Sequence, residues 1–230
     1  NSQEKVMQND FISACDNVLK EKEDLAIFHM DTVNDVDRGY YVLANNIDAT
    51  GYQHKDNVRI GGSSGKNFPD VGFLGTLEGN GYTISNLTLN QGGLLSNIGV
   101  GGTVRNIGFK NVLWGGTKND AERFTLATYI NGGILENIYI QSNTIKDVAN
   151  CGLVALNVLF NTTIKNCLFV LDDPAGFLDK AQYGAIGSFA ALCIENGNVP
   201  ATSGSFLVDT YVVSSVPMTR SSPRADNKYY

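Results

Sequence analysis

The sequence predicts an all-β fold, a right-handed parallel β-helix with a short α-helix covering its N-terminal end. Three observations carry this prediction: a recurring unit centred on asparagine, glycine-rich turns between units, and alternating apolar residues after each asparagine. Units that recur at intervals of about twenty residues or more are typical of solenoids, because each coil travels once around the stack. The right-handedness follows from the chirality of parallel crossover connections.

The recurring unit is an apolar residue, a spacer, an asparagine and then apolar-x-apolar. It occurs as TISNLTL (83–89), TVRNIGF (103–109), ILENIYI (134–140) and TIKNCLF (163–169), with FLVDTYV (206–212) as a variant copy. Asparagine tolerates left-handed backbone and hydrogen-bonds locally, as a corner between two strands requires. We therefore expect the corner residues to form a single ladder along the stack: Asn86, Asn106, Asn137, Asn166 and Asp209.

After each corner, successive side chains point to opposite faces of the strand. The set predicted to fill the core is Leu87, Leu89, Ile107, Phe109, Ile138, Ile140, Cys167 and Phe169. The set predicted to point away from the core is Thr88, Gly108, Tyr139 and Leu168. Ahead of Asn86, EGNGY (78–82) predicts a tight glycine turn.

The chain divides into an N-terminal helix and cap (1–37), the β-helix (38–213) and a C-terminal tail or linker (214–230). The capping helix is predicted over 9–20, where Phe11, Cys15, Val18 and Leu19 share one helical face. LAIFHM (25–30) predicts a short strand, and polar or glycine-rich stretches at 53–72, 113–129, 172–182 and 195–204 predict outer loops.

Composition excludes several classes of protein. A net charge of −6 disfavours nucleic-acid binding, which needs clustered cations. The longest apolar runs fall short of the roughly 20 residues that a membrane-spanning helix needs. The four cysteines lack CxxC spacing, so we expect buried free thiols, no metal and no cofactor.

No catalytic residue is assigned from the sequence. GGSSGKN (61–67) lacks the first glycine and the final Ser or Thr of a phosphate loop, and no nucleophile stands in an elbow motif. Parallel β-helices do host polysaccharide lyases and glycoside hydrolases, and Asp172 with Asp173 is the candidate carboxylate pair. The same LDDPAG stretch also suits a turn.

Aromatic side chains give the clearer indication of binding, because they stack on sugar rings and anchor interfaces. The candidates are Trp114, which opens a long loop, and then Phe124, Tyr129 and the outward-pointing Tyr139. The alternative interpretation is that Trp114 packs the loop onto the β-helix.

The ordering YYVLANNIDATG, FLGTLEGNGYTISNLTL and GGLLSNIGVGGTVRNIGFKNV resembles the GLUG-related β-helical repeats of large bacterial surface and secreted proteins. It covers residues 38–112 and continues loosely to about 170; Asn46 stands where that family usually has an aspartate. The resemblance implies a modular secreted or surface-anchored protein with a pectate-lyase-like β-helix that contacts glycans or proteins without catalysis.

We therefore expect a non-catalytic extracellular or cell-surface module for adhesion or for binding host or dietary glycans or surface proteins. Alternatives are a polysaccharide-degrading enzyme on a β-helix and a phage-type receptor-binding segment. The chain begins at Asn1 without a basic or apolar leader, so a signal peptide is expected outside this segment. Neither nucleic acid nor membrane insertion is expected.

Overall fold

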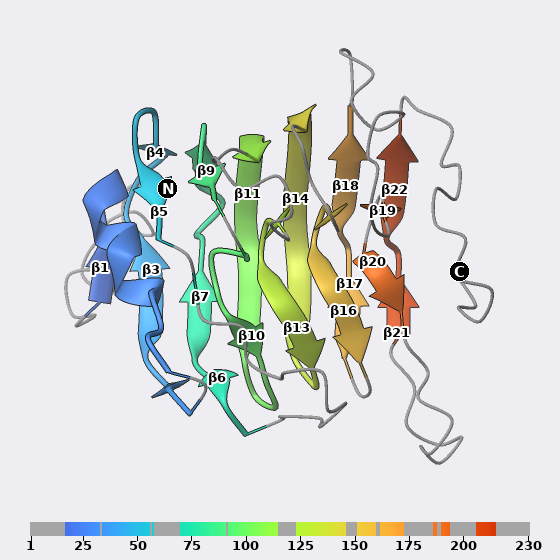
Figure 1. Cartoon of the computed structure of the whole chain (residues 1–230), viewed down its shortest axis with the longest axis horizontal. Helices are drawn as coiled ribbons and strands as arrows, with labels where there is room; N and C mark the ends of the chain where they lie inside the picture. Colours follow the sequence, from blue (N-terminus) through green and yellow to red (C-terminus); the bar gives the residue numbers. More distant parts are fainter. Residues whose placement is uncertain are drawn as a thin grey trace, which may run out of the picture.

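Strands dominate the regular structure of the chain in a computed structural model that describes residues 17–32, 34–55, 57, 70–90, 92–114, 123–145, 151–159, 162–172, 186–187, 190–193 and 206–214. Within these ranges every strand pairing is parallel. The strands follow one another in chain order along the long axis of the molecule (Figure 1). The prediction of an all-β fold with parallel pairing is confirmed.

The described strands form three sheets, which we name A, B and C. Sheet A contains β1 (Asn17–Leu19), β3 (Tyr40–Leu43), β4 (Ile47–Asp48), β5 (Gln53–His54), β7 (Thr76–Glu78), β8 (Thr83–Ser85), β9 (Thr88–Leu89), β11 (Thr103–Trp114), β14 (Ile134–Ile145), β17 (Thr163–Lys165), β18 (Leu168–Leu171), β21 (Phe206–Val208) and β22 (Tyr211–Ser214). Sheet B contains β2 (Val36–Asp37), β6 (Gly72–Phe73), β10 (Asn97–Ile98), β13 (Ala127–Asn131), β16 (Ala155–Leu159) and β20 (Ala190–Cys193). Sheet C contains β12 (Arg123–Phe124), β15 (Cys151–Gly152) and β19 (Ile186–Gly187). From β11 to β22 the chain passes through the sheets in the repeating order A, C, B.

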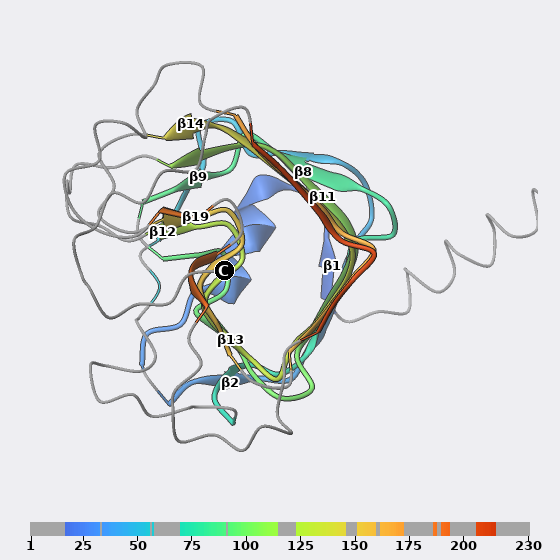
Figure 2. The ribbon, with the colours of Figure 1, turned by 90° about the vertical axis from the view of Figure 1, so that its right-hand side faces the viewer.

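The core lies in the space that the three sheets surround when the molecule is viewed along its long axis (Figure 2). The largest fully buried side chains are Phe28, Phe73, Phe109, Phe124, Phe169, Leu25, Leu43, Leu77 and Ile84. Every residue of the predicted core set is at most 2% exposed, as its alternation predicts. In the predicted outward set, Gly108 is buried instead, because Thr83 of the adjacent strand lies over it; a Cβ at Gly108 would meet Thr83 Cγ2 at 2.7 Å.

Corners with left-handed backbone explain how one long strand keeps its apolar residues inside. Strand β11 bends at Asn106 (φ 54°) and Asn111 (φ 51°). Simple alternation would bury Val104 and then Asn106, but the left-handed corner turns the chain so that Ile107 is buried instead. Asparagine is among the few residues that adopt this backbone conformation at low cost, which is why it marks the corners.

The corner side chains form two columns, where the sequence predicts a single ladder. In the first column Asn137 Nδ2 donates to Asn106 Oδ1 (2.8 Å), and Asn106 Nδ2 donates to both oxygens of Glu78 (3.0 and 3.1 Å). In the second, Asn111 Nδ2 donates to Asn86 Oδ1 (2.6 Å). The prediction that Asn86 aligns with Asn106 and Asn137 is wrong.

Strand pairing gives the reason for this error. Thr103 pairs with Thr76 and Gly108 pairs with Thr83, so the corner at Asn106 lies opposite the Gly79–Tyr82 turn. TVRN (103–106) therefore corresponds to TLEG (76–79), and the partner of Asn86 is the asparagine at 111 in FKNV. Two similar motifs therefore occupy different corners of sheet A.

The N-terminal end differs from its prediction. Residues 9–16 of the expected helix 9–20 lie outside the described residues, but Asn17–Leu19 is strand β1, which pairs with Tyr41–Leu43. Val18 and Leu19 are thus strand residues. The sequence did not reveal this, because a short apolar run has no periodicity that distinguishes a helix turn from a strand. Sheets A and B also begin before residue 38, with β1 and β2.

A 3-10 helix, η1 (Lys22–Phe28), occupies the segment where LAIFHM predicts a strand. The Asp24 carboxylate accepts hydrogen bonds from the backbone N–H groups of Lys20 and Glu21, which starts the helix. The ring centroid of Phe28 lies 5.0 Å from that of Tyr41 and 5.9 Å from that of Phe73, and both pairs are edge-to-face. Figure 2 shows the helix inside the outline of the sheets, so it covers the N-terminal end of the core.

Sheet C also contradicts a predicted loop. Residues 113–129 were expected to form one outer loop, but Leu113 and Trp114 end β11, and β12 and the start of β13 lie within it. Phe124 and Leu126 are fully buried, so this segment contributes to the core. Residues 115–122, and most of the loops expected at 53–72, 172–182 and 195–204, lie outside the described residues.

A buried polar cluster lies beside η1. His54, which is 1% exposed, contacts Tyr52 Oη through Nδ1 (3.0 Å) and Asn57 Nδ2 through Nε2 (3.3 Å). Asn57 in turn accepts a bond from the Met30 N–H and donates to the backbone oxygens of Gly93 and Leu94. Burial, with a smaller effect from His29, lowers the pKa of His54 to about 4.

The lowered pKa of His54 predicts a loss of stability in mild acid. The folded chain holds this histidine neutral, so its contribution is complete above the unfolded pKa of about 6.5 and is lost as the pH falls toward 4. Urea unfolding should show a decrease of roughly 2 kcal/mol between pH 7 and pH 5. His54→Gln should flatten this slope, while His29→Gln, which removes only the smaller contribution to the lowered pKa of His54, should keep most of it. Equal slopes for the parent and His54→Gln would contradict the assignment.

The corner at Asn137 (φ 53°) gives a second prediction. Asn137→Gly keeps the left-handed backbone and loses the bond to Asn106, so we expect a cost of about 1 kcal/mol. Asn137→Ala adds about 1–2 kcal/mol of backbone strain. Urea denaturation of both variants measures the difference. If glycine and alanine cost the same, the left-handed corner does not constrain the residue at this position.

Candidate functional site

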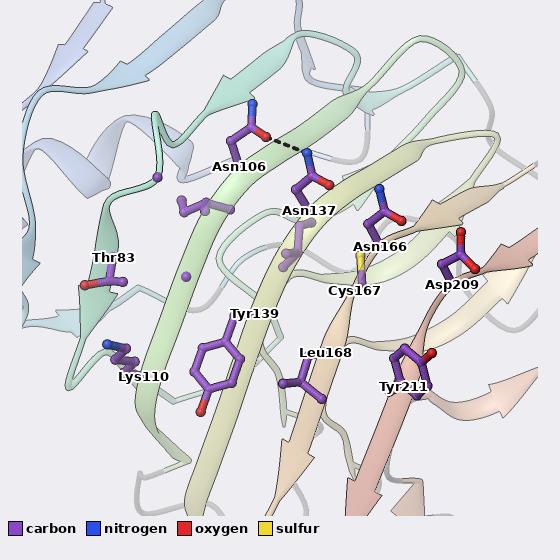
Figure 3. A pocket seen from close by; sticks show the side chains of 14 residues that line it. Thr83, Asn106, Lys110, Asn137, Tyr139, Asn166, Cys167, Leu168, Asp209 and Tyr211 are labelled. Atoms are coloured by element: carbon purple, nitrogen blue, oxygen red, sulfur yellow. Dashed lines mark hydrogen bonds between the residues drawn. The ribbon is translucent and has the colours of Figure 1, made fainter. Parts of the chain in front are cut away.

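An open groove of about 750 Å³ runs across the outer face of sheet A. It crosses β8, β11, β14, β18 and β22, which lie side by side in register. Its lining consists of Gly81, Thr83, Asn106, Ile107, Gly108, Lys110, Asn137, Ile138, Tyr139, Asn166, Cys167, Leu168, Asp209 and Tyr211 (Figure 3). The groove is the candidate site because it joins exposed apolar side chains to polar groups that are open to solvent.

The floor of the groove is one row of paired residues. Gly108 pairs with Tyr139, Tyr139 with Leu168, and Leu168 with Tyr211. Each follows a corner by two residues, so each points away from the core. Tyr139 is half-buried, Leu168 is 38% exposed and Tyr211 is 68% exposed. Gly108 adds no side chain, so the apolar part of the floor begins at Tyr139.

One wall of the groove is the row of corner residues. Asn106, Asn137, Asn166 and Asp209 all have left-handed backbone, with φ from 46° to 54°. Figure 3 shows them following one another beside the row of Tyr139, Leu168 and Tyr211. Asn106 and Asn137 are joined by their hydrogen bond. Among the described residues, the side chains of Asn166 and Asp209 have no hydrogen-bond partner, which leaves their polar atoms available to a ligand.

The charges next to the groove are already paired. Arg105 Nε contacts Glu78 Oε2 at 2.7 Å, and hydrogen bonds to Glu78 and Tyr40 raise the pKa of Arg105. Further along the same row, Lys165 Nζ lies 3.8 Å from Glu136 Oε1. The lining itself carries one ammonium group, Lys110, and one carboxylate, Asp209. The groove is therefore close to neutral and rich in amide groups.

The described lining of the groove has groups that can contact a sugar and a single carboxylate. Glycoside hydrolysis uses two carboxylates about 5–10 Å apart, and the lining supplies one. Asp172 does not line the groove; its N–H donates to Ser142 O (2.9 Å), and Asp173 lies outside the described residues. Within the described ranges no cluster of three metal-ligating side chains is present. Tyrosines next to free amide and carboxylate groups can stack on a sugar ring and bond its hydroxyls.

The structure brings one of the four predicted binding residues to the groove. Tyr139 lies on its floor. Phe124 on β12 is fully buried, so the expectation that it is exposed is not met. Tyr129 is half-buried on sheet B, between Asn97 and the residue at 157, and does not line the groove. Trp114 ends β11, paired with Leu89 and Ile145, and its side chain lies outside what the structure describes.

Sequence reasoning did not select Leu168, Tyr211, Asn166 or Asp209 as binding residues. The repeat contains the signal that finds them. The residue two positions after each corner occupies the same row, so the position of Tyr139 in ILENIYI predicts Tyr211 in FLVDTYV. Exposure, which the sequence does not give, then separates these residues from the buried ones.

Comparison with known proteins gives one partial match. Over an alignment of 80 positions, the chain is 39% identical to part of a protein named halomucin from Haloquadratum walsbyi; the match covers 31% of this chain and about 1% of that protein. No family model and no solved structure matches the chain. Among the helices in the described ranges, none is long and apolar enough to cross a membrane.

Cys167, beneath the groove floor, gives a prediction about reactivity. It is a free cysteine, 2% exposed, whose Sγ lies 3.2 Å from Lys165 O, and burial raises the pKa of its thiol. We expect Cys167 to resist iodoacetamide at pH 8 in the folded chain and to react after unfolding in urea, since the thiolate is the reactive form. Mass spectrometry of its peptide distinguishes it from the other cysteines. Rapid native alkylation would contradict its burial.

Proposed function

We propose that this chain is a module of an extracellular or cell-surface protein and that it binds glycans through the groove on sheet A without transforming them. The observation that carries the proposal is the row of Tyr139, Leu168 and Tyr211 beside the corner residues Asn166 and Asp209. Tyrosine rings recognise the apolar faces of sugars, while amide and carboxylate groups recognise their hydroxyls.

The proposal includes a finer fold, a right-handed parallel β-helix. The repeated passage of the chain through sheets A, C and B supports it, because each round adds one parallel strand to each sheet. Parallel crossovers are right-handed in nearly all proteins, which supports the handedness. A stack of this kind presents equivalent residues at intervals of one strand spacing, about 4.8 Å, on an extended surface.

An extracellular location is part of the proposal. The partial match to a protein named halomucin and the resemblance to bacterial surface repeats both favour it. The net charge of −6 and the near-neutral groove favour a glycan or protein partner over nucleic acid. Adhesion to host or dietary glycans is the role that fits these features.

A glycan array with the purified, folded chain tests the proposal. We expect binding, and we expect Tyr139→Ala to weaken the affinity for the bound glycan about tenfold, because loss of a stacking ring costs on the order of 1.4 kcal/mol. Tyr129→Ala is the matched control, since it removes a half-buried tyrosine from sheet B. Circular dichroism checks that both variants fold.

The same preparation separates binding from catalysis. Reducing-sugar and unsaturated-uronate assays on the bound glycans should show no turnover. Turnover that Asp172→Asn or Asp173→Asn abolishes would replace the proposal with a polysaccharide-degrading enzyme. An array without any bound glycan, or binding that Tyr139→Ala leaves unchanged, would remove the groove as a glycan site.

A further inference from the structure

The spacing of the two tyrosines in the groove carries information about the ligand. Tyr139 on β14 pairs with Leu168 on β18, and Leu168 pairs with Tyr211 on β22. The tyrosines are therefore two strand spacings apart, about 9.6 Å along the stack. Because the strands are parallel and the three residues are in register, the side chains project from equivalent positions.

A linear polymer that meets both tyrosines must present the same kind of surface at that interval. In a β-1,4-linked pyranose chain with equatorial linkages, each ring is turned over relative to the one before it. The same ring face therefore returns at every second sugar, and the length of one disaccharide is close to two strand spacings. An α-1,4-linked chain curls away from a straight row and does not keep this register.

The polar groups of the groove follow the same interval. Each floor residue has a corner residue two positions before it in the chain: Asn137 for Tyr139, Asn166 for Leu168, and Asp209 for Tyr211. A straight chain of three rings over the floor thus has one polar side chain beside each ring. Leu168, between the two tyrosines, supplies an apolar contact for the middle ring.

The charges of the groove restrict the polymer further. Its described lining has Lys110 as its one cation and Asp209 as its one carboxylate, and the chain as a whole carries −6. A polyanion such as a uronate polymer would need a row of cations, which this lining does not provide. The lining suits a polymer whose hydroxyl groups are its only polar groups.

We infer that the groove binds a neutral β-1,4-linked polysaccharide, of the glucan or mannan class, with its chain across the strands and with Tyr139 and Tyr211 stacked on every second ring. This inference rests on the proposed glycan-binding function and adds the linkage, the charge and the direction of the ligand. A three-ring segment is the shortest that reaches both tyrosines.

Calorimetric titration of the folded chain with cello- and manno-oligosaccharides of two to six rings tests the inference. For at least one series we expect the affinity to rise about tenfold from two rings to three, when the second tyrosine is engaged. Malto-oligosaccharides of equal length, which are α-1,4-linked, should bind at least tenfold more weakly.

Variants assign the length dependence to the tyrosines. Tyr139→Ala and Tyr211→Ala should each lower the trisaccharide affinity about tenfold, and the disaccharide affinity at most about twofold, since a disaccharide uses either ring. Tyr40→Ala is the matched control: Tyr40 is an exposed tyrosine on the same sheet, outside the groove lining. Because Tyr211 is 68% exposed, its replacement should leave the fold intact, which circular dichroism checks.

The outcomes separate this inference from the proposed function. Equal affinities for two and three rings, or tighter binding of malto-oligosaccharides or uronate polymers that still depends on Tyr139, would overturn the inference and leave glycan binding in place. No binding of any glycan would overturn both.

Discussion

From β7 onward, each passage of the chain across sheet A goes through a residue with left-handed backbone, and the rest of the structure depends on this constraint. The corner changes which residues face inward, so Val104 and Ile107 are both buried although they are three positions apart. It also sets the outward row, because the residue two positions after the corner points away from the core, with Tyr139, Leu168 and Tyr211 reaching solvent and Gly108 covered by Thr83. The buried core and the outer groove therefore both depend on the corner residues. Asparagine adopts the left-handed backbone that a corner requires at low cost.

The two columns of corner side chains share one direction. Each amide donates toward the N-terminal end of the stack, and each column starts on a carboxylate: Glu78 accepts from Asn106, and Asp48 accepts from Asn86 (2.8 Å). Hydrogen bonds from the Thr50 side chain, Asn86 and the Thr50 backbone lower the pKa of Asp48 to about 2. A carboxylate has acceptors only, so it fixes the orientation of every amide that follows.

The sequence predicts much of this fold because alternation and corner residues are local signals. The burial of Ile107, Phe109, Ile138 and Ile140 follows from alternation alone. The pairing register of the strands does not follow from these local signals. TISN and TVRN look alike, but the glycine turn at 79–82 places them at different corners. Phe124 was assigned to an outer loop because a two-residue strand has no periodicity to reveal it. The outward position of Tyr139 follows from alternation, and the same position in the repeat indicates Tyr211, whereas the exposure of Tyr211 becomes clear only in the structure.

The direction of the amide columns has a consequence for chemical ageing. Hydrolysis of an asparagine amide leaves an aspartate, which cannot donate the bond that its position supplies. At Asn106 the new carboxylate would face the buried carboxylate of Glu78, and repulsion between like charges would replace two hydrogen bonds. The lost amide would therefore disturb the coil on the N-terminal side of the damaged residue, while the coil on its C-terminal side would keep an acceptor. Slow deamidation would thus weaken the stack in one direction, from the damaged corner toward the N-terminal end that η1 covers.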